Sequence, residues 1–450
     1  MASDGDRAAD VSANRLQEAH SVSWRLPEVL RYSPVRLALG PGRLNDLGPL
    51  ARQEGDTRVL LVSDEGIRAA GHLQRAARSL RGAGLSLTTF TGVQENPTTG
   101  HVSVGLRAAS CSPSGQEPLP PVARAQPGAA VPHTVGGSQP GVALPHVQPE
   151  TAALRVDFVV ALGGGSVMDC AKGINLLYSN GGRMQDYRGD PPPDVLAKRK
   201  PLLPMILIPT TAGTGSEAQS FALVSDEQTH LKMACGDRRF PGGLRPRVAI
   251  LDPELPVTQP RGVAAAAGMD AISHAVETAA STARNERSRE LSAAAWQALS
   301  AAFPRVMQRP TDAGLWQDML LGAHLAGAAI EPSMLGAAHA CANPLTARFG
   351  IAHGVAVGVM LPHVVRFNAG DARDGEHPYA HLCRSAEELA RRLEDFLAIS
   401  ALPRSLCALG VPESSLPELA ELAATQWTAR FNPRRVSQTE LLQIYRHALG

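Results

Sequence analysis

Four side chains in the second half of the chain have the types and spacing that suit a divalent metal ion. Asp270 and His274 stand four residues apart in GMDAISHAVE, so a helix would place them on one face. His339 and His353 follow, fourteen residues apart, in AAHACANPLTARFGIAHG. One carboxylate and three imidazoles suit Fe²⁺ or Zn²⁺ and leave a position for a substrate. Spacing alone leaves a plainer explanation open, because a lone buried histidine is more often a hydrogen-bonded core residue.

Two loops of small residues in the first half are typical of a phosphate or dinucleotide site. ALGGGSVMDCAK (161–172) follows an apolar run and opens a helical pattern. Its glycines let backbone amides approach a ligand, and a helix N-terminus attracts anions. PTTAGTGSE (209–217) also follows an apolar run, although an ordinary loop with a Ser/Thr helix cap would look the same. Two such loops at one end of a parallel sheet favour a shared crevice.

One acidic residue bears on the choice of cofactor. Asp64 stands just after the apolar run VLLVS. A carboxylate there could accept a hydrogen bond from a ribose hydroxyl and would repel a 2′-phosphate. The position therefore favours NAD over NADP.

The elements that must position these residues divide the chain near Pro256. Residues 32–256 alternate β-branched apolar runs with helical stretches, which predicts an α/β dinucleotide-binding domain with a mostly parallel, Rossmann-like sheet. Residues 257–450 have a helical pattern almost throughout, so we expect an all-α metal-binding domain. Residues 1–31 resemble a flexible extension. The Pro- and Gly-rich segment 109–153 is interpreted as a disordered insertion or an error in the gene model.

Composition narrows the class of protein. The 450 residues carry a formal net charge of +1, which shows no bias of the whole chain toward nucleic acid or anionic membranes. No apolar run reaches the roughly 20 residues that span a bilayer. The six cysteines are scattered without a C-x-x-C pair, which favours reduced thiols. We expect a cytoplasmic protein without nucleic-acid or membrane partners.

Taken together and in this order, the motifs resemble the iron-containing (group III, metal-dependent) alcohol dehydrogenase family. GPGRLNDLG, NPT at 96–98, DPEL and AHGVAVGVMLPHVVRFN add to the motifs already quoted, and the resemblance covers roughly residues 32–108 and 154–450. It implies an NAD(H)-linked enzyme that interconverts a primary or secondary alcohol with its aldehyde or ketone. It also implies a homodimer or a higher homo-oligomer.

The resemblance further assigns roles to individual residues. The four metal-ligand positions fall on Asp270, His274, His339 and His353. The cofactor positions fall on Asp64, Gly164, Gly165, Ser166, Asp169, Thr210, Thr211 and Thr214, with Lys232 as a further contact. A metal in such a site would stabilise the alkoxide, and the nicotinamide would take the hydride.

Two alternatives stay open. A hydroxyacid–oxoacid transhydrogenase of the same family would recycle its bound cofactor between two substrates and would turn over without free NADH. The fold class also permits a dehydroquinate-synthase-like lyase, but that family has a glutamate where this chain has Asp270. It also needs a basic phosphonate pocket, for which the sequence offers no residues.

One position departs from the family pattern. Four residues after the third ligand, where the family usually has a second histidine, this chain has Asn343. An amide can orient a substrate but cannot exchange a proton near pH 7. Either the proton leaves through water or the cofactor ribose in a natural subfamily, or the enzyme is weakened or specialised. We prefer the first interpretation because the rest of the site is intact.

Overall fold

The structure, a computed structural model, describes residues 33, 35–55, 57–110, 156–189, 193–229, 231–236, 239, 243–370 and 377–450. The extension expected at residues 1–31 lies outside this set. The insertion expected at 109–153 lies outside it from residue 111 onward. Its first two residues, Ala109 and Ser110, instead complete helix α6 (Thr99–Ser110).

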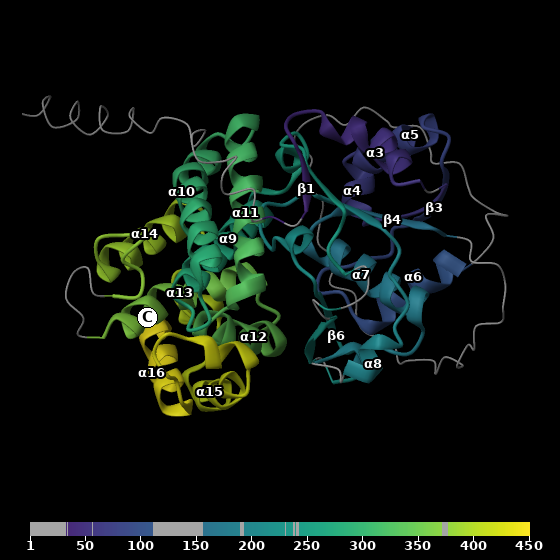
Figure 1. Ribbon diagram of the computed structural model, residues 1–450. Helices are drawn as coiled ribbons and strands as arrows, with labels where there is room; N and C mark the ends of the chain where they lie inside the picture. The colour runs from purple at the N-terminus through teal and green to yellow at the C-terminus, as the bar shows by residue number, and fades with distance from the viewer. Residues whose placement is uncertain are drawn as a thin grey trace, which may run out of the picture.

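A parallel sheet of six strands forms the first half of the described chain (Figure 1). Its strands, in spatial order, are β1 (Arg36–Leu39), β8 (Val248–Leu251), β5 (Met205–Pro209), β4 (Phe158–Gly163), β2 (Arg58–Val62) and β3 (Ser86–Phe90). Every residue of β4, β5 and β8 is buried, as expected for parallel strands covered on both faces. The predicted α/β class with a parallel sheet is confirmed.

Alternation along β2 shows how the two faces are covered. Leu60 and Val62 join the core beneath α6 and α7 (Gly165–Asn180), whereas Val59 and Leu61 join the core beneath α3 (Leu47–Gln53) and α5 (His72–Gly82). Short helices α4 (Glu65–Ala69) and α8 (Pro193–Ala197) complete this half. An antiparallel pair, β6 (Ala222–Ser225) and β7 (Lys232–Cys235), was not anticipated from the sequence.

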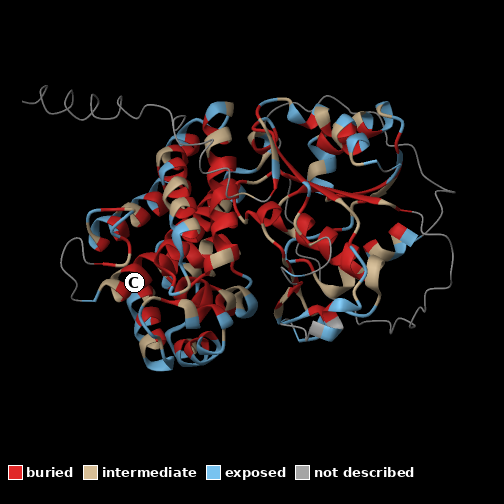
Figure 2. Cartoon of the chain, viewed as in Figure 1, coloured by how far each residue is buried: buried red, intermediate tan, exposed pale blue. Residues whose placement is uncertain are grey.

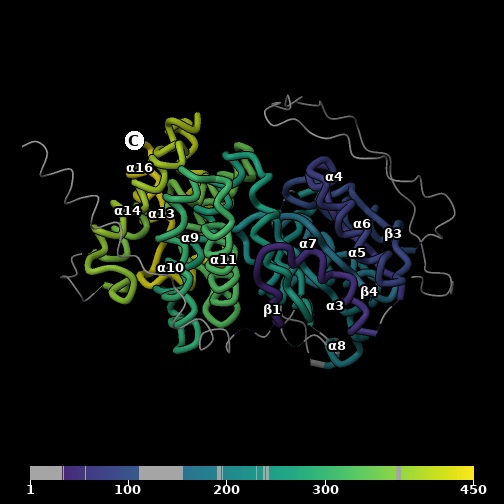
Figure 3. Tube along the Cα trace, turned by 90° about the horizontal axis from the view of Figure 1, so that it is seen from above, coloured from purple at the N-terminus to yellow at the C-terminus, as the bar shows by residue number. Residues whose placement is uncertain are grey.

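The second half is helical, as predicted. Its helices are α9 (Arg261–Ala280), α10 (Glu286–Gln308), α11 (Ala313–Ser333), α12 (Ala337–Phe349), α13 (His353–Ala369), α14 (Ala386–Ile399), α15 (Leu416–Ala424) and α16 (Gln438–Leu449). Helix α9 is buried along most of its length, and Figure 2 shows the burial concentrated in α9, α11 and the sheet. Figures 1 and 3 show the two halves side by side, with α11 near β1.

The described helices and cysteines can be compared with the expectations about membranes and thiols. None of the described helices is both long and apolar enough to cross a membrane. In the described part of the chain the cysteines carry free thiols, in keeping with the expectation of reduced cysteines.

Candidate metal and cofactor site

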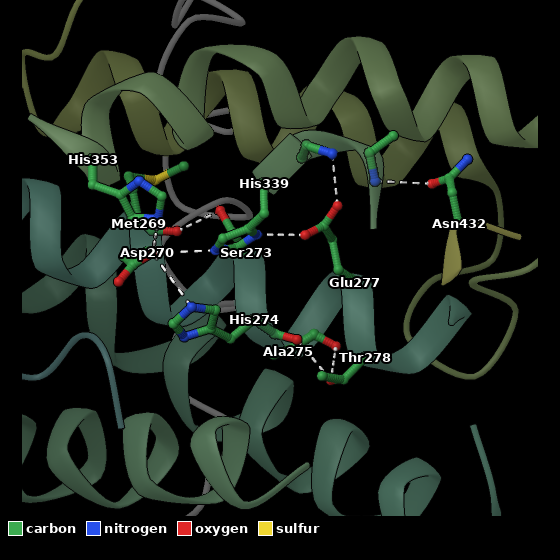
Figure 4. Close-up of polar contacts among 12 residues, drawn as sticks. Met269, Asp270, Ser273, His274, Ala275, Glu277, Thr278, His339, His353 and Asn432 are labelled. Atoms are coloured by element: carbon green, nitrogen blue, oxygen red, sulfur yellow. Dashed lines mark hydrogen bonds and ion pairs between the residues drawn. The ribbon is translucent and has the colours of Figure 1, made fainter. Parts of the chain in front are cut away.

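The predicted metal ligands meet around one carboxylate oxygen. Asp270 Oδ1 on α9 lies 3.4 Å from His274 Nε2, 3.6 Å from His339 Nε2 and 3.8 Å from His353 Nε2. His339 belongs to the first turn of α12 and His353 begins α13, so three helices converge here (Figure 4). His339 and His353, fourteen residues apart in the sequence, thus lie close together in the structure.

These distances fit an ion better than they fit hydrogen bonds. All three exceed the usual range for an N–H···O bond. Two ligands about 2.1 Å from a shared tetrahedral ion lie about 3.4 Å apart. Asp270 Oδ1 and His339 Nε2 are buried and have no hydrogen-bond partner among the described residues. One ligand atom each from Asp270, His339 and His353 lies within 4.8 Å of the others, so these three residues fit a divalent metal.

His274 differs from the other three predicted ligands in how its ring is placed. Its ring stacks on His339 with centroids 4.9 Å apart and an interplanar angle of 20°. It falls outside the group of three whose ligand atoms are mutually close. Its Nε2 nevertheless lies nearer to Asp270 Oδ1, at 3.4 Å, than the Nε2 of either other histidine.

The three histidines differ in the direction in which their surroundings shift the pKa. Burial disfavours charge on His339, but the carboxylates of Glu277 and Asp270 outweigh it and raise its pKa to about 9. Burial lowers the pKa of His274 to about 4 and also lowers the pKa of His353. Burial alone would raise the pKa of Asp270, yet the facing imidazoles, His274 foremost, lower it. The carboxylate is therefore anionic, as a metal ligand must be.

Small residues allow the helices to approach closely enough to form this cluster. A Cβ at Gly354, next to His353, would lie 2.0 Å from the carbonyl oxygen of Ala266 on α9. A Cβ at Gly213, in the loop after β5, would lie 3.0 Å from Ala267 Cβ. The metal helix α9 therefore packs directly against both α13 and the threonine-rich loop.

Sequence reasoning overlooked Glu277, which contacts a predicted ligand. Its Oε2 lies 2.5 Å from His339 Nδ1, and its Oε1 accepts a hydrogen bond of 2.7 Å from the Ala338 amide. The signal was present in GMDAISHAVE, since Glu277 follows His274 by three residues on the same helix.

Asp64 and the glycine loop, both predicted to bind a cofactor, lie where the strand order of the sheet reverses. From β2 the chain runs outward to β3 and then returns to β4 on the other side of β2. Asp64 follows β2, and Gly164, Gly165 and Ser166 follow β4, so both flank this switch point. Open α/β sheets bind ligands in the crevice at such a point.

The glycine and threonine loops contact each other. A Cβ on Gly165 would lie 2.4 Å from Thr214 Cγ2, and one on Gly164 would lie 3.4 Å from Thr211 Oγ1. The amide of Thr210 donates to the carbonyl of Gly163. The structure thus brings together the loops that the sequence predicted would share a crevice.

Two of the predicted cofactor residues, Asp64 and Asp169, make hydrogen bonds within the protein. Asp64 caps α4 by accepting a 2.8 Å hydrogen bond from the Ile67 amide, and burial raises its pKa. Asp169 accepts a 2.6 Å hydrogen bond from Ser216 Oγ. Lys172, missed by the sequence analysis, is fully buried and donates to Ser216 Oγ at 2.8 Å. Asp169 therefore belongs to a paired network beneath the loops.

Lys232 lies within electrostatic reach of both parts of the site. It is half-buried on β7, and burial lowers its pKa while the charges of Asp270 and Asp169 act in the opposite direction. Among the described residues the structure gives its ammonium group no hydrogen bond or ion pair within 4 Å. Its position suits a ligand that extends from the glycine loop toward the metal cluster.

Asn343 has a partner that the sequence did not suggest. Its Nδ2 donates a 3.0 Å hydrogen bond to Oε1 of Gln426, which precedes the exposed Trp427. Asn343 lies one helical turn after His339 on α12. The amide is thus oriented by the C-terminal segment, and its Oδ1 is left to accept a hydrogen bond.

Comparisons with known proteins cover both halves. The family model described as iron-containing alcohol dehydrogenase matches residues 34–113 and 145–253, and the one described as Fe-containing alcohol dehydrogenase family, C-terminal, matches residues 264–449.

Individual relatives extend over nearly the whole chain. Alcohol dehydrogenase 4 of Schizosaccharomyces pombe is 30% identical over 97% of this chain and 93% of its own length. NAD-dependent methanol dehydrogenase of Bacillus methanolicus is 27% identical over 93% and 99%, respectively. A crystal structure of 1,3-propanediol oxidoreductase superposes with a TM-score of 0.76 at 26% identity and covers 92% of this chain and 98% of that one.

Proposed function

This chain belongs to the iron-containing alcohol dehydrogenase family, and we propose that it is a metal-dependent, NAD(H)-linked alcohol dehydrogenase. Its reaction would be reversible hydride transfer between a primary or secondary alcohol and the corresponding aldehyde or ketone. The observation that carries the proposal is Oδ1 of Asp270, which is buried without a hydrogen-bond partner among the described residues and has three imidazole nitrogens within 3.8 Å. Buried polar atoms normally have hydrogen-bond partners, and the three imidazoles around this oxygen favour an ion as its partner.

When bound, the metal would stabilise the alkoxide and NAD would accept the hydride. The chain's own residues supply the position of each. Asp270, His339 and His353 would hold the ion, with His274 as the fourth ligand. Fe²⁺ is the first choice and Zn²⁺ the second, since both suit a mixed carboxylate and imidazole set.

We assign the dinucleotide to the carboxyl ends of β2, β4 and β5, where Asp64 and the two loops lie. The amides at Gly164, Gly165 and Ser166 open α7, a helix long enough to favour a pyrophosphate at its N-terminus. Thr210, Thr211 and Thr214 would line the opposite wall, and Lys232 would reach the ribose nearest the metal. Asp169 contributes indirectly, through Ser216 beneath the threonine loop.

Asn343 would contact the substrate rather than exchange a proton. Its Nδ2 donates to Gln426, so its Oδ1 would serve the ligand as a neutral acceptor. In this proposal the alcohol proton leaves through water or the cofactor ribose. The substrate would be a small alcohol or aldehyde, and the protein a homo-oligomer of at least two chains in the cytoplasm.

Anaerobic purification, metal analysis and an NAD-reduction screen across short alcohols, diols and hydroxy acids test the proposal. We expect about one divalent ion per chain and NADH formation with at least one alcohol. Oxidation of a hydroxy acid only when an oxoacid is present, with no free NADH, would instead indicate the transhydrogenase. Light scattering on the same sample measures the oligomeric state.

A further inference from the structure

We propose that Glu277 is a positioning residue that fixes His339 for metal binding and anchors the start of α12 at the same time. This inference rests on the proposed metal site. It concerns a residue outside the ligand set, one that acts through His339.

The first contact fixes the histidine ring. Glu277 Oε2 and His339 Nδ1 are 2.5 Å apart, and both side chains are buried. A carboxylate can only accept, so Nδ1 carries the hydrogen and donates it. In the neutral ring that a metal ion binds, Nε2 is then the nitrogen that offers a lone pair. It faces Asp270 Oδ1 at 3.6 Å. Partners of this kind orient metal-bound histidines and raise their basicity.

The second contact fixes the helix that carries the histidine. Helix α12 begins after Gly336, which has no side chain to cap the first free amides. Glu277 Oε1 accepts from the Ala338 amide at 2.7 Å, and Asn432 Oδ1 accepts from the Ala337 amide at 3.3 Å (Figure 4). A Cβ at Gly336 would lie 3.0 Å from Glu277 Oε1, so the residue without a side chain makes room for the carboxylate.

Together these contacts require a carboxylate. Glutamine has nearly the same shape but one acceptor and one donor end. If its oxygen accepts from Ala338, its NH₂ group faces His339 Nδ1 and favours the tautomer with hydrogen on Nε2, which cannot bind a metal. If its oxygen accepts from His339, its NH₂ group opposes the Ala338 amide. Either orientation loses one of the two functions.

The test is Co²⁺ binding to metal-free protein, measured by chelator competition and by the visible absorption of bound Co²⁺, an ion that carboxylate and imidazole sites accept. We expect Glu277→Gln to weaken Co²⁺ binding by about 10- to 100-fold and to shift the absorption bands, while circular dichroism stays unchanged. Unchanged Co²⁺ affinity and spectrum in Glu277→Gln would overturn the proposal.

Two controls separate positioning from structure. Glu331→Gln alters another buried carboxylate, which accepts from the Ser220 amide and hydroxyl, and should change Co²⁺ affinity by less than about threefold. Asn432→Ala removes the neighbouring cap but leaves the Glu277–His339 contact, so it should lower thermal stability and leave the Co²⁺ spectrum as it is. Weakening of Co²⁺ binding by Asn432→Ala equal to that of Glu277→Gln would reduce Glu277 to a helix cap and overturn the proposal.

Two further outcomes are distinguishable. If Glu277→Gln does not fold, Glu277→Asp replaces it, because aspartate is still an acceptor only but is one methylene shorter. Unchanged Co²⁺ affinity in Glu277→Asp would then contradict the proposal. Failure of the unaltered protein to bind Co²⁺ would instead overturn the metal site of the proposed function, and the role of Glu277 with it.

Discussion

The metal cluster and the base of the cofactor loops are both buried and polar, but they differ in how their groups are paired. Beneath the loops, Lys172 donates to Ser216, which in turn donates to Asp169. In the cluster, Asp270 Oδ1 and His339 Nε2 are buried without a partner among the described residues. Since unpaired buried polar groups are costly, the unpaired set indicates a ligand-binding role and the paired set indicates a structural role.

Asp270→Asn tests the unpaired side, and here we expect the largest effect. The variant removes the negative charge that faces all three histidines, which should abolish tight metal binding and lower kcat/KM by about 10³-fold, or about 4 kcal/mol. Metal analysis and steady-state kinetics measure both. Asp395→Asn, on the exposed side of α14, serves as the control. Normal metal content in Asp270→Asn would show that this cluster is not the metal site.

Lys172→Met tests the paired side. Lys172 Nζ also donates to the carbonyls of Gln219 and Phe221, at 3.0 Å each, so the variant leaves buried acceptors unpaired. We expect the free energy of unfolding to fall by roughly 3 kcal/mol and the KM for NAD to rise, with metal content unchanged. Lys198→Met, an exposed lysine, should change stability by less than about 0.5 kcal/mol. If Lys172→Met lost its metal but kept its stability, Lys172 would serve the metal site rather than the fold.

Gly354→Ala tests whether helix packing holds the cluster together. The new methyl group would collide with the backbone of Ala266, so α13 must shift and carry His353 away from Asp270. We expect a loss of roughly 1–3 kcal/mol in stability together with weaker metal binding. Gly262→Ala on α9 meets no atom within 4 Å and should be neutral or slightly stabilising. Thermal melts with and without added metal distinguish the two variants.

Asp64→Ser sharpens the distinction between a structural and a ligand-facing carboxylate. Serine can still cap α4, as Asp64 does through Ile67, but it removes the charge. We expect the ratio of NADP to NAD in kcat/KM to rise by about tenfold, or about 1.4 kcal/mol. Glu65→Gln removes a neighbouring exposed charge and should leave the ratio nearly unchanged. Equal use of both cofactors by the unaltered protein would contradict the assignment.

Asn343→His should have the smallest effect. We expect a folded, metal-bound enzyme whose substrate range and pH profile change, with kcat/KM altered by less than about tenfold. Gln426→Ala, which frees the Asn343 amide, should alter KM more than kcat. An unaltered protein that binds metal and NAD but turns over nothing, next to an active Asn343→His, would show that the site is weakened rather than specialised.

The sequence by itself determined the local features. Continuous apolar runs predicted the buried parallel strands, since such strands need apolar side chains on both faces. The spacing of Asp270 and His274, and the glycines after β4, indicated the chemistry, because helical periodicity and small residues act over a few positions.

Only the tertiary structure decided what lies far apart in the chain. The contact of Glu277 with His339, the hydrogen bond from Asn343 to Gln426 and the pairing of Lys172 with Ser216 each join separate elements. No local pattern encodes such contacts, since they depend on how closely the helices and loops pack. The same is true of the stacking of His274 on His339. The spacing of residues in the sequence could indicate candidate ligands. The packing of the helices decides which histidine nitrogens face Asp270 and which carboxylates are left unpaired.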